Sequence, residues 1–189
     1  MLYDPLKTAL VTIDLQGMVV GRETHPHSAD TVISNSLKLA HHVRAKGGAL
    51  AFVRVKFAPK GVDAPYANVD SPGQYPEAGT PPAAFAHAPG LAEITPDIDL
   101  IKRQWGAFHG TELDTLLRRR GIDTIILTGI ATNFGVESTA REAWSRYYGV
   151  IIAEDAVSGL NDGMHDFAVK NIFPRISRVR STAEILANA

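Results

Sequence analysis

The stretch LTGIATNFGVESTAR, residues 127–141, decides the fold of this chain because it passes from strand to helix within a few residues. The β-branched run before it, 124–127, predicts a buried strand. The run after it, 133–148, predicts a helix, whose apolar face has helical spacing: Val136, Ala140, Ala143 and Tyr147. A buried strand that leads straight into an amphipathic helix is typical of α/β proteins.

The same alternation continues along the whole chain. We expect strands over 8–13, 49–55, 98–101, 124–127, 150–153 and 176–179. We expect helices over 29–46, 111–120, 133–148 and 162–173, and a capping box of Ser181 and Glu184 that opens a last short helix. Such alternation predicts a parallel sheet with helices on both faces. The expected fold is therefore a three-layer α/β/α, Rossmann-like fold with a six-stranded parallel sheet, in one domain over 1–189.

Composition excludes several classes of function. The 189 residues fit one domain, and 45% hydrophobic with 21% charged residues is ordinary for a globular protein. A formal net charge of -1 gives no basic footprint for nucleic acid. Apolar runs are strand-sized, well short of the roughly 20 residues that cross a bilayer, and the first residues lack the pattern of a signal peptide. We therefore expect a cytoplasmic protein without nucleic-acid or membrane partners. Because the chain has no cysteine, thiol chemistry and disulfides are excluded.

The segment 56–96 interrupts the alternation. It holds eight of the eleven prolines of the chain. A connection of this length is usually functional or disordered. We expect either a surface excursion, or a lid or subunit-contact arm beside the active site.

Polar residues follow three of the predicted strands, and ligands of open α/β sheets bind at the carboxyl ends of strands. Asp14 follows 8–13, Lys102 follows 98–101, and the turn at 132–135 follows 124–127. A charged residue next to a buried strand is costly unless it is paired, so we expect Asp14 and Lys102 to lie together in one cleft. Taken singly, Asp14 could instead cap a helix or a turn, Lys102 could be solvated, and Asn133 could cap its helix.

Three stretches resemble the isochorismatase-like hydrolases: ALVTIDLQ (9–16), KRQWGAFHGTEL (102–113) and the run 121–141. They occur in the right order, and the tail 154–186 is similar too. In the amidase branch of that family, an Asp, Lys and Cys triad cleaves amides through a thioester. Asp14 and Lys102 match the first two positions, and Gly135 stands where the cysteine stands. The resemblance also implies a cis peptide between Ile130 and Ala131, which would aim backbone N–H groups at the substrate.

Isochorismatases proper also carry glycine at that position, and they cleave a vinyl ether without a nucleophilic side chain. The resemblance therefore implies a hydrolase of a small carboxylate-bearing metabolite, with Asp14 as the acid and Lys102 either binding substrate carboxylates or setting the proton balance. The residues expected to bind substrate are Gln16, Trp105, Phe108, Ile130, Ala131, Thr132, Asn133 and Gly135. For Trp105 and Phe108, core packing is an equal alternative. Arg54 is a further candidate for an anionic group, and His109 for a substrate contact.

Two other functions remain open. A catalytically silent binding protein could keep the same pocket as a sensor or an assembly subunit. A nucleotide-binding Rossmann protein is disfavoured, because no glycine-rich fingerprint follows the run 8–13. The resemblance implies a homodimer or larger homo-oligomer.

No cofactor and no metal are expected. The nicotinamidase branch carries an Asp-x-His cluster after its second strand, whereas here Asp63 is the only acid soon after it and the next histidine is His87. His25 and His27 have a spacing that could chelate an ion, with Asp30 nearby. Two histidines in a polar loop are more often solvated.

Overall fold

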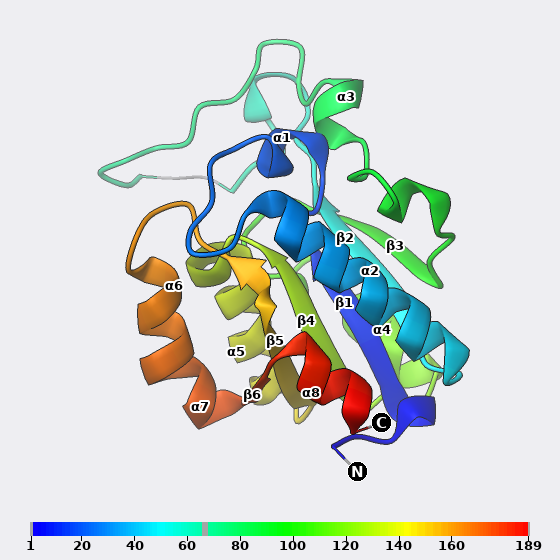
Figure 1. Cartoon of the computed structure of the whole chain (residues 1–189). Coiled ribbons are helices and arrows are strands. Elements are labelled where there is room, and N and C mark those ends of the chain that lie inside the picture. The colour runs from blue at the N-terminus through cyan, green and yellow to red at the C-terminus, as the bar shows by residue number, and fades with distance from the viewer. Residues whose placement is uncertain (1, 66–67, 189) are drawn as a thin grey trace.

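A six-stranded parallel sheet forms the centre of the computed structural model, which describes residues 2–65 and 68–188 (Figure 1). Its strand order is β3-β2-β1-β4-β5-β6. The strands are β1 (Thr8–Ile13), β2 (Ala49–Val55), β3 (Ile98–Lys102), β4 (Thr124–Ile130), β5 (Gly149–Ser158) and β6 (Arg178–Arg180). The chain runs outward from β1 to β3 and then returns to β4 beside β1, so the strand order reverses between β1 and β4. The expected Rossmann-like fold is confirmed, and its switch point lies where ligands of such sheets bind.

Helices cover both faces of the sheet. They are α1 (Gly17–Val20), α2 (Ala29–Ala45), α3 (Pro82–Phe85), α4 (Leu113–Arg119), α5 (Glu137–Ser145), α6 (Met164–Phe167), α7 (Phe173–Ile176) and α8 (Thr182–Ala187). In Figure 1, α2 and α8 lie in front of the sheet and α4 and α5 behind it. The predicted capping box of Ser181 and Glu184 opens α8. Within the part of the chain that the structure describes, no helix combines the length and the apolar character needed to cross a membrane.

Alternate side chains of β1, β2, β4 and β5 enter two separate hydrophobic cores. On β1, Leu10 packs with the buried face of α2, which includes Val32 and Leu39. Its neighbours Val11 and Ile13 pack on the opposite side, in the core that α4 and α5 close. Fully burying one such aliphatic side chain contributes about 1.5–3 kcal/mol, so two filled cores hold the sheet rigid beneath its carboxyl edge.

Four strands differ from the prediction, and the first of them, β3, ends one residue later, at Lys102. β4 continues from Leu127 to Ile130 because Gly129, with φ 130°, lets Ile13 of β1 approach closely: a Cβ there would lie 2.1 Å from the Ile13 carbonyl oxygen. β5 continues to Ser158 through two acidic residues, one of which, Asp155, accepts hydrogen bonds from the backbone and hydroxyl of Thr182. β6 begins at Arg178, two residues later than predicted, because the preceding helix α7 extends to Ile176.

The described part of the proline-rich segment 56–96 folds back over the carboxyl edge of β1 and β2. It contains α3 and two short 3-10 turns, Pro59–Gly61 and Leu91–Glu93. A β-bridge joins Gln16 to His87, and the Arg54 guanidinium donates to the Phe85 carbonyl. The part after α3 is therefore attached to the strand ends that carry the candidate site.

Candidate active site

Asp14 begins the candidate site at the end of β1. Its backbone has a positive φ of 55°, and its N–H donates to the Val53 carbonyl at 2.9 Å. This turn directs the side chain into the protein, where only 6% of the residue remains exposed. Such a conformation is uncommon outside glycine, and Asp is among the residues that tolerate it best.

Lys102, at the end of β3, reaches Asp14 across the neighbouring strand. Its Nζ lies 2.7 Å from Oδ2 of Asp14, and only 2% of Lys102 is exposed. The same ammonium donates to the carbonyls of Gln104 at 3.0 Å and Trp105 at 2.9 Å. Since an ammonium has three protons, these partners use all of them. The structure thus brings together the two residues that were expected to pair.

The Asp14 carboxyl retains one free acceptor. Its Oδ1 is buried and has no hydrogen-bond partner among the described residues. Burial raises the pKa of Asp14 above its ordinary value, although the charge of Lys102 and its hydrogen bond act in the opposite direction. A carboxyl with a raised pKa and an unpaired oxygen is suited to hold and release a proton.

The turn after β4 closes the site from the other side of β1. The peptide bond between Ile130 and Ala131 is cis, as predicted. A five-residue π-helix, Thr132–Val136, follows and leads into α5. A Cβ added to Gly135 would lie 3.1 Å from Oδ2 of Asp14 and 2.8 Å from Cγ2 of Ile13. Gly135 therefore faces the carboxylate directly, with no room for a side chain in the present packing.

The two aromatic residues expected at the site have different environments. Trp105 is 62% exposed, and its ring contacts that of Phe134 edge-on at 4.9 Å between centroids. Phe108 is 4% exposed and lies in the core against Tyr148, which places it in the packing role. Phe134 was not predicted as a site residue, although it lies within the turn that carries the family resemblance.

Gln16 has a different position from that expected of a substrate-binding residue. It is completely buried, and its amide donates to the carbonyls of Val55 and Ala84. Its Oε1 accepts from the Val55 N–H at 2.7 Å. The side chain thus fastens α3 to the end of β2, and its polar atoms are committed to the backbone.

The side chains of Thr132 and Asn133 turn toward α6 instead of capping their own helix. The Thr132 hydroxyl lies 3.0 Å from Nδ1 of His165. The Asn133 amide donates to the sulfur of Met164 at 3.2 Å, and no side-chain hydrogen bond caps this helix. The Oδ1 atom of Asn133 is buried and has no hydrogen-bond partner among the described residues.

The two further candidates, Arg54 and His109, have different surroundings. Nη2 of Arg54 donates to both carboxylate oxygens of Asp99, at 3.0 and 2.8 Å, so its charge is already compensated. His109 is exposed and follows the buried Phe108.

The residues that the sequence offered for metal binding do not come together in the structure, and each has a different partner. Asp63 pairs with Arg103, and His87 lies 3.7 Å from Asp99. His25 pairs with Asp162 at 3.2 Å, whereas His27 lies 3.2 Å from Glu154.

A third histidine, His165, completes a cluster with His27 and Glu154 that was not predicted. One possible ligand atom from each of the three residues lies within 4.8 Å of the others. Its members come from the loop before α2, from β5 and from α6, and their distance along the chain gives no local motif that could have shown it.

Comparisons with known proteins identify the family of this chain. The isochorismatase domain model matches residues 8–184. The uncharacterized isochorismatase family protein YecD of Escherichia coli O157:H7 is 47% identical over 179 residues, which cover 95% of this chain and 94% of the relative. The ureidoacrylate amidohydrolase RutB of Methylobacterium radiotolerans is 30% identical over 191 residues, with coverage of 89% and 74%. A solved isochorismatase family protein from Burkholderia thailandensis has a TM-score of 0.89 at 40% identity, with coverage of 96% and 95%. The chain therefore belongs to the isochorismatase family of hydrolases.

Proposed function

We propose that this protein hydrolyses an enol ether of a small carboxylate-bearing metabolite, with Asp14 as the acid and without a covalent intermediate. The observation that carries the proposal is the state of the Asp14 carboxyl. It is buried, its pKa is raised, its Oδ1 has no partner among the described residues, and it faces Gly135. A general acid needs a proton near working pH and an open direction in which to deliver it.

The chemistry requires one proton and one water molecule. Protonated Asp14 donates to the terminal carbon of the enol ether, and the adjacent carbon becomes an oxocarbenium ion. Water adds to that carbon and returns a proton to the Asp14 carboxylate. The resulting hemiketal breaks its carbon–oxygen bond to give a 2-oxo acid and an alcohol. The acid is regenerated, and the net reaction consumes one water.

Lys102 acts on Asp14 in this proposal and leaves substrate recognition to other groups. Its three protons are donated to Asp14 and to two backbone carbonyls, so none remains for a substrate carboxylate. It stabilises the carboxylate that forms once the proton has left. Removing Lys102 should therefore change the pH dependence of turnover more than the affinity for substrate.

The exposed ring of Trp105 supplies the wall for the substrate. Its backbone carbonyl holds Lys102, and the same oxygen lies 3.5 Å from a Cβ built on Gly135. Its ring contacts Phe134 and is largely free to meet a ligand. Trp105→Ala should raise KM with little effect on kcat, whereas Asp14→Asn should abolish kcat.

Amide hydrolysis is the second candidate, because the relative RutB is named a ureidoacrylate amidohydrolase. The triad that the amidase branch uses requires a cysteine, and this chain has none. An amide would have to be attacked by water activated at Asp14. A deprotonated base is needed for that step, and the raised pKa of Asp14 favours the proton donor instead.

The test is release of a 2-oxo acid from isochorismate and from simpler enolpyruvyl ethers, followed with a coupled dehydrogenase. Wild type should turn over at least one of these compounds, and Asp14→Asn should lose the activity. Asp70→Asn, at an exposed position, is the matched control and should retain it. If folded wild type releases no product while the same compounds raise its unfolding temperature, the protein is a binding protein and the proposed reaction is wrong.

A further inference from the structure

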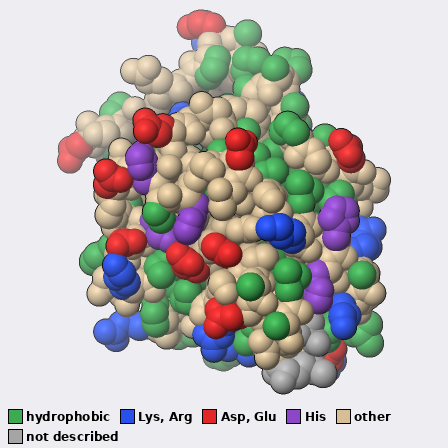
Figure 2. Space-filling model, in the orientation of Figure 1, with side chains coloured by type: hydrophobic (Ala, Val, Ile, Leu, Met, Phe, Trp, Pro, Cys, Tyr) green, Lys and Arg blue, Asp and Glu red, His purple; other side chains and the backbone are tan. Residues whose placement is uncertain are grey.

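The cluster of His27, Glu154 and His165 lies apart from the acid–lysine pair and has no part in the proposed reaction. Nε2 of His27 lies 3.2 Å from Oε1 of Glu154, and Nε2 of His165 lies 3.5 Å from the same oxygen. The two imidazole rings are perpendicular, with centroids 5.5 Å apart. In the space-filling view, histidine and acidic side chains gather on the left of this face (Figure 2).

His165 is oriented as metal-binding histidines usually are. Its Nδ1 lies 3.0 Å from the Thr132 hydroxyl. When Nδ1 donates its proton to that hydroxyl, Nε2 is left as a free ligand. His165 is 2% exposed, and its Nε2 has no hydrogen-bond partner in the described chain. A buried nitrogen of this kind is costly unless something binds it. The neighbouring acid is Glu154, whose Oε1 lies 3.5 Å from Nε2. When Nδ1 carries the ring proton, Nε2 and Oε1 are both acceptors, and a cation between them would satisfy both.

The separations match those of a tetrahedral ion. Two ligand atoms that each lie about 2.1 Å from a tetrahedral ion are about 3.4 Å apart. The two separations to Glu154 are 3.2 and 3.5 Å, and the third pair of ligand atoms is no more than 4.8 Å apart. A shift of about 1 Å by the partly exposed His27 ring would complete the geometry.

The backbone that carries His27 is already held in place. The His27 N–H donates to the Ser158 hydroxyl at 3.2 Å, and that hydroxyl donates back to the His27 carbonyl at 2.7 Å. The Thr24 hydroxyl donates to the same carbonyl at 2.8 Å. A β-bridge between His25 and Gly159 fixes the loop on the preceding side. The cost of ordering the ligands would therefore be small.

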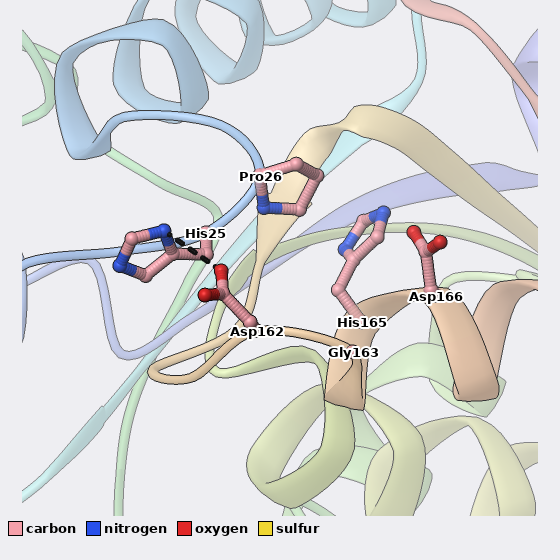
Figure 3. A pocket seen from close by; sticks show the side chains of 6 residues that line it. All are labelled: His25, Pro26, Asp162, Gly163, His165 and Asp166. Carbon is pink, nitrogen blue, oxygen red and sulfur yellow. Dashed lines mark ion pairs between the residues drawn. The ribbon is translucent and has the colours of Figure 1, made fainter.

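An open cavity borders the cluster at His165. It has a volume of about 190 Å³ and is lined by His25, Pro26, Asp162, Gly163, His165 and Asp166 (Figure 3). Figure 3 shows the paired His25 and Asp162 on one side of this cavity and His165 on the other. Water from the cavity could take the fourth coordination position.

We propose that His27, Glu154 and His165 form a binding site for one Zn²⁺ ion. Two imidazoles and one carboxylate, with a fourth position for water, are a donor set that Zn²⁺ uses in proteins. Because Thr132 contacts His165, an ion here would also brace the turn that follows the cis peptide. The site is distinct from the reaction proposed for Asp14, and either can fail without the other.

The test uses the tag-free chain, stripped with a chelator and titrated with ZnCl₂ by calorimetry, with bound metal counted by elemental analysis. We expect one Zn²⁺ per chain, and an affinity at least 100-fold weaker in His165→Ala, Glu154→Gln and His27→Ala. Thr132→Val should weaken binding about 10–100-fold through the orientation of His165. Substitution by Co²⁺ should give the visible absorption of a four- or five-coordinate ion, and this should be lost in the same variants.

His25→Ala is the matched control, because His25 is two residues from His27 but pairs with Asp162. It should bind Zn²⁺ as wild type does. Circular dichroism of each metal-free variant checks folding, and Glu154→Gln, which keeps size and shape, carries the test if His165→Ala does not fold. The proposal is overturned if wild type binds no stoichiometric Zn²⁺, if Glu154→Gln and His27→Ala bind it unchanged, or if His25→Ala abolishes binding.

Discussion

Two groups of charged and polar side chains lie near the carboxyl edge of the sheet, and they differ in how their buried polar atoms are compensated. Nζ of Lys102 lies 2.7 Å from Oδ2 of Asp14, and the lysine donates its remaining protons to two carbonyls. His27, Glu154 and His165 contain no cation of this kind, and two of their atoms converge on one carboxylate oxygen. In the first group a lysine within the protein compensates the carboxyl and only Oδ1 of Asp14 lacks a partner among the described residues, whereas in the second group Nε2 of the buried His165 lacks one.

This difference suggests different kinds of function. A closed pair can tune the proton affinity of one carboxyl, because its surroundings are fixed by two filled cores. The cluster of His27, Glu154 and His165 lies beside a cavity and can bind an ion from solution. Substitutions in the two groups should therefore change different properties. Those in the pair of Asp14 and Lys102 should change folding stability and its pH dependence, and those in the histidine cluster should change ligand affinity.

The largest expected effect comes from breaking the closed pair with Lys102→Met. It leaves Asp14 buried without its cation, and removing one partner of a buried ion pair costs about 3–5 kcal/mol. We expect a loss of this size in the free energy of unfolding, measured with urea at pH 8. Glu154→Gln is the comparison at the open cluster and should cost about 1 kcal/mol or less in metal-free protein. Equal losses in the two variants would mean that the groups do not differ as described.

A smaller effect is expected from Gly135→Ala, which tests how closely the site is packed. The added Cβ would meet Ile13 Cγ2 at 2.8 Å and Asp14 Oδ2 at 3.1 Å. Overpacking of this kind typically costs about 1–3 kcal/mol. Gly159→Ala is the control beside the open cluster, where the nearest atom would be 3.4 Å away, an ordinary contact. Thermal unfolding of the pair should show a clear loss in the first variant, and little change in the second.

Much of the fold could be predicted because the central strands are short, β-branched and buried. β1 and β2 have the predicted bounds, since polar or glycine residues adjoin both ends of each run. The predicted end of β5 was wrong because a tertiary partner decides it. Asp155 looks like the end of a strand, but Thr182 satisfies its carboxylate from 27 residues away and β5 continues.

The pairing of Asp14 with Lys102 could be predicted from their charges. A carboxylate and an ammonium that follow buried strands must be compensated, and each is the other's partner here. Gln16 was less predictable, because its amide is used by Ala84, 68 residues later in the proline-rich segment. The cluster of His27, Glu154 and His165 could not be read from spacing at all, since 127 residues separate the first two members.

The smallest expected effect is a pH slope, which measures whether burial or the lysine controls Asp14. Burial raises its folded-state pKa above the ordinary value of 3.8, so folding takes up a proton between the two values. The stability that Asp14 contributes is therefore fully present below the ordinary value and is lost as pH rises through the folded-state pKa.

Over that window, the free energy of unfolding of wild type relative to Asp14→Asn should fall with rising pH, by at most about 1.4 kcal/mol per pH unit. Urea titrations at intervals from pH 4 upward measure the slope. A slope of the opposite sign would mean that Lys102 overcomes burial and lowers the pKa. Asp14 would then be a carboxylate in the resting protein, suited to activate water, and the proposed acid would have to be replaced by a base at the same position.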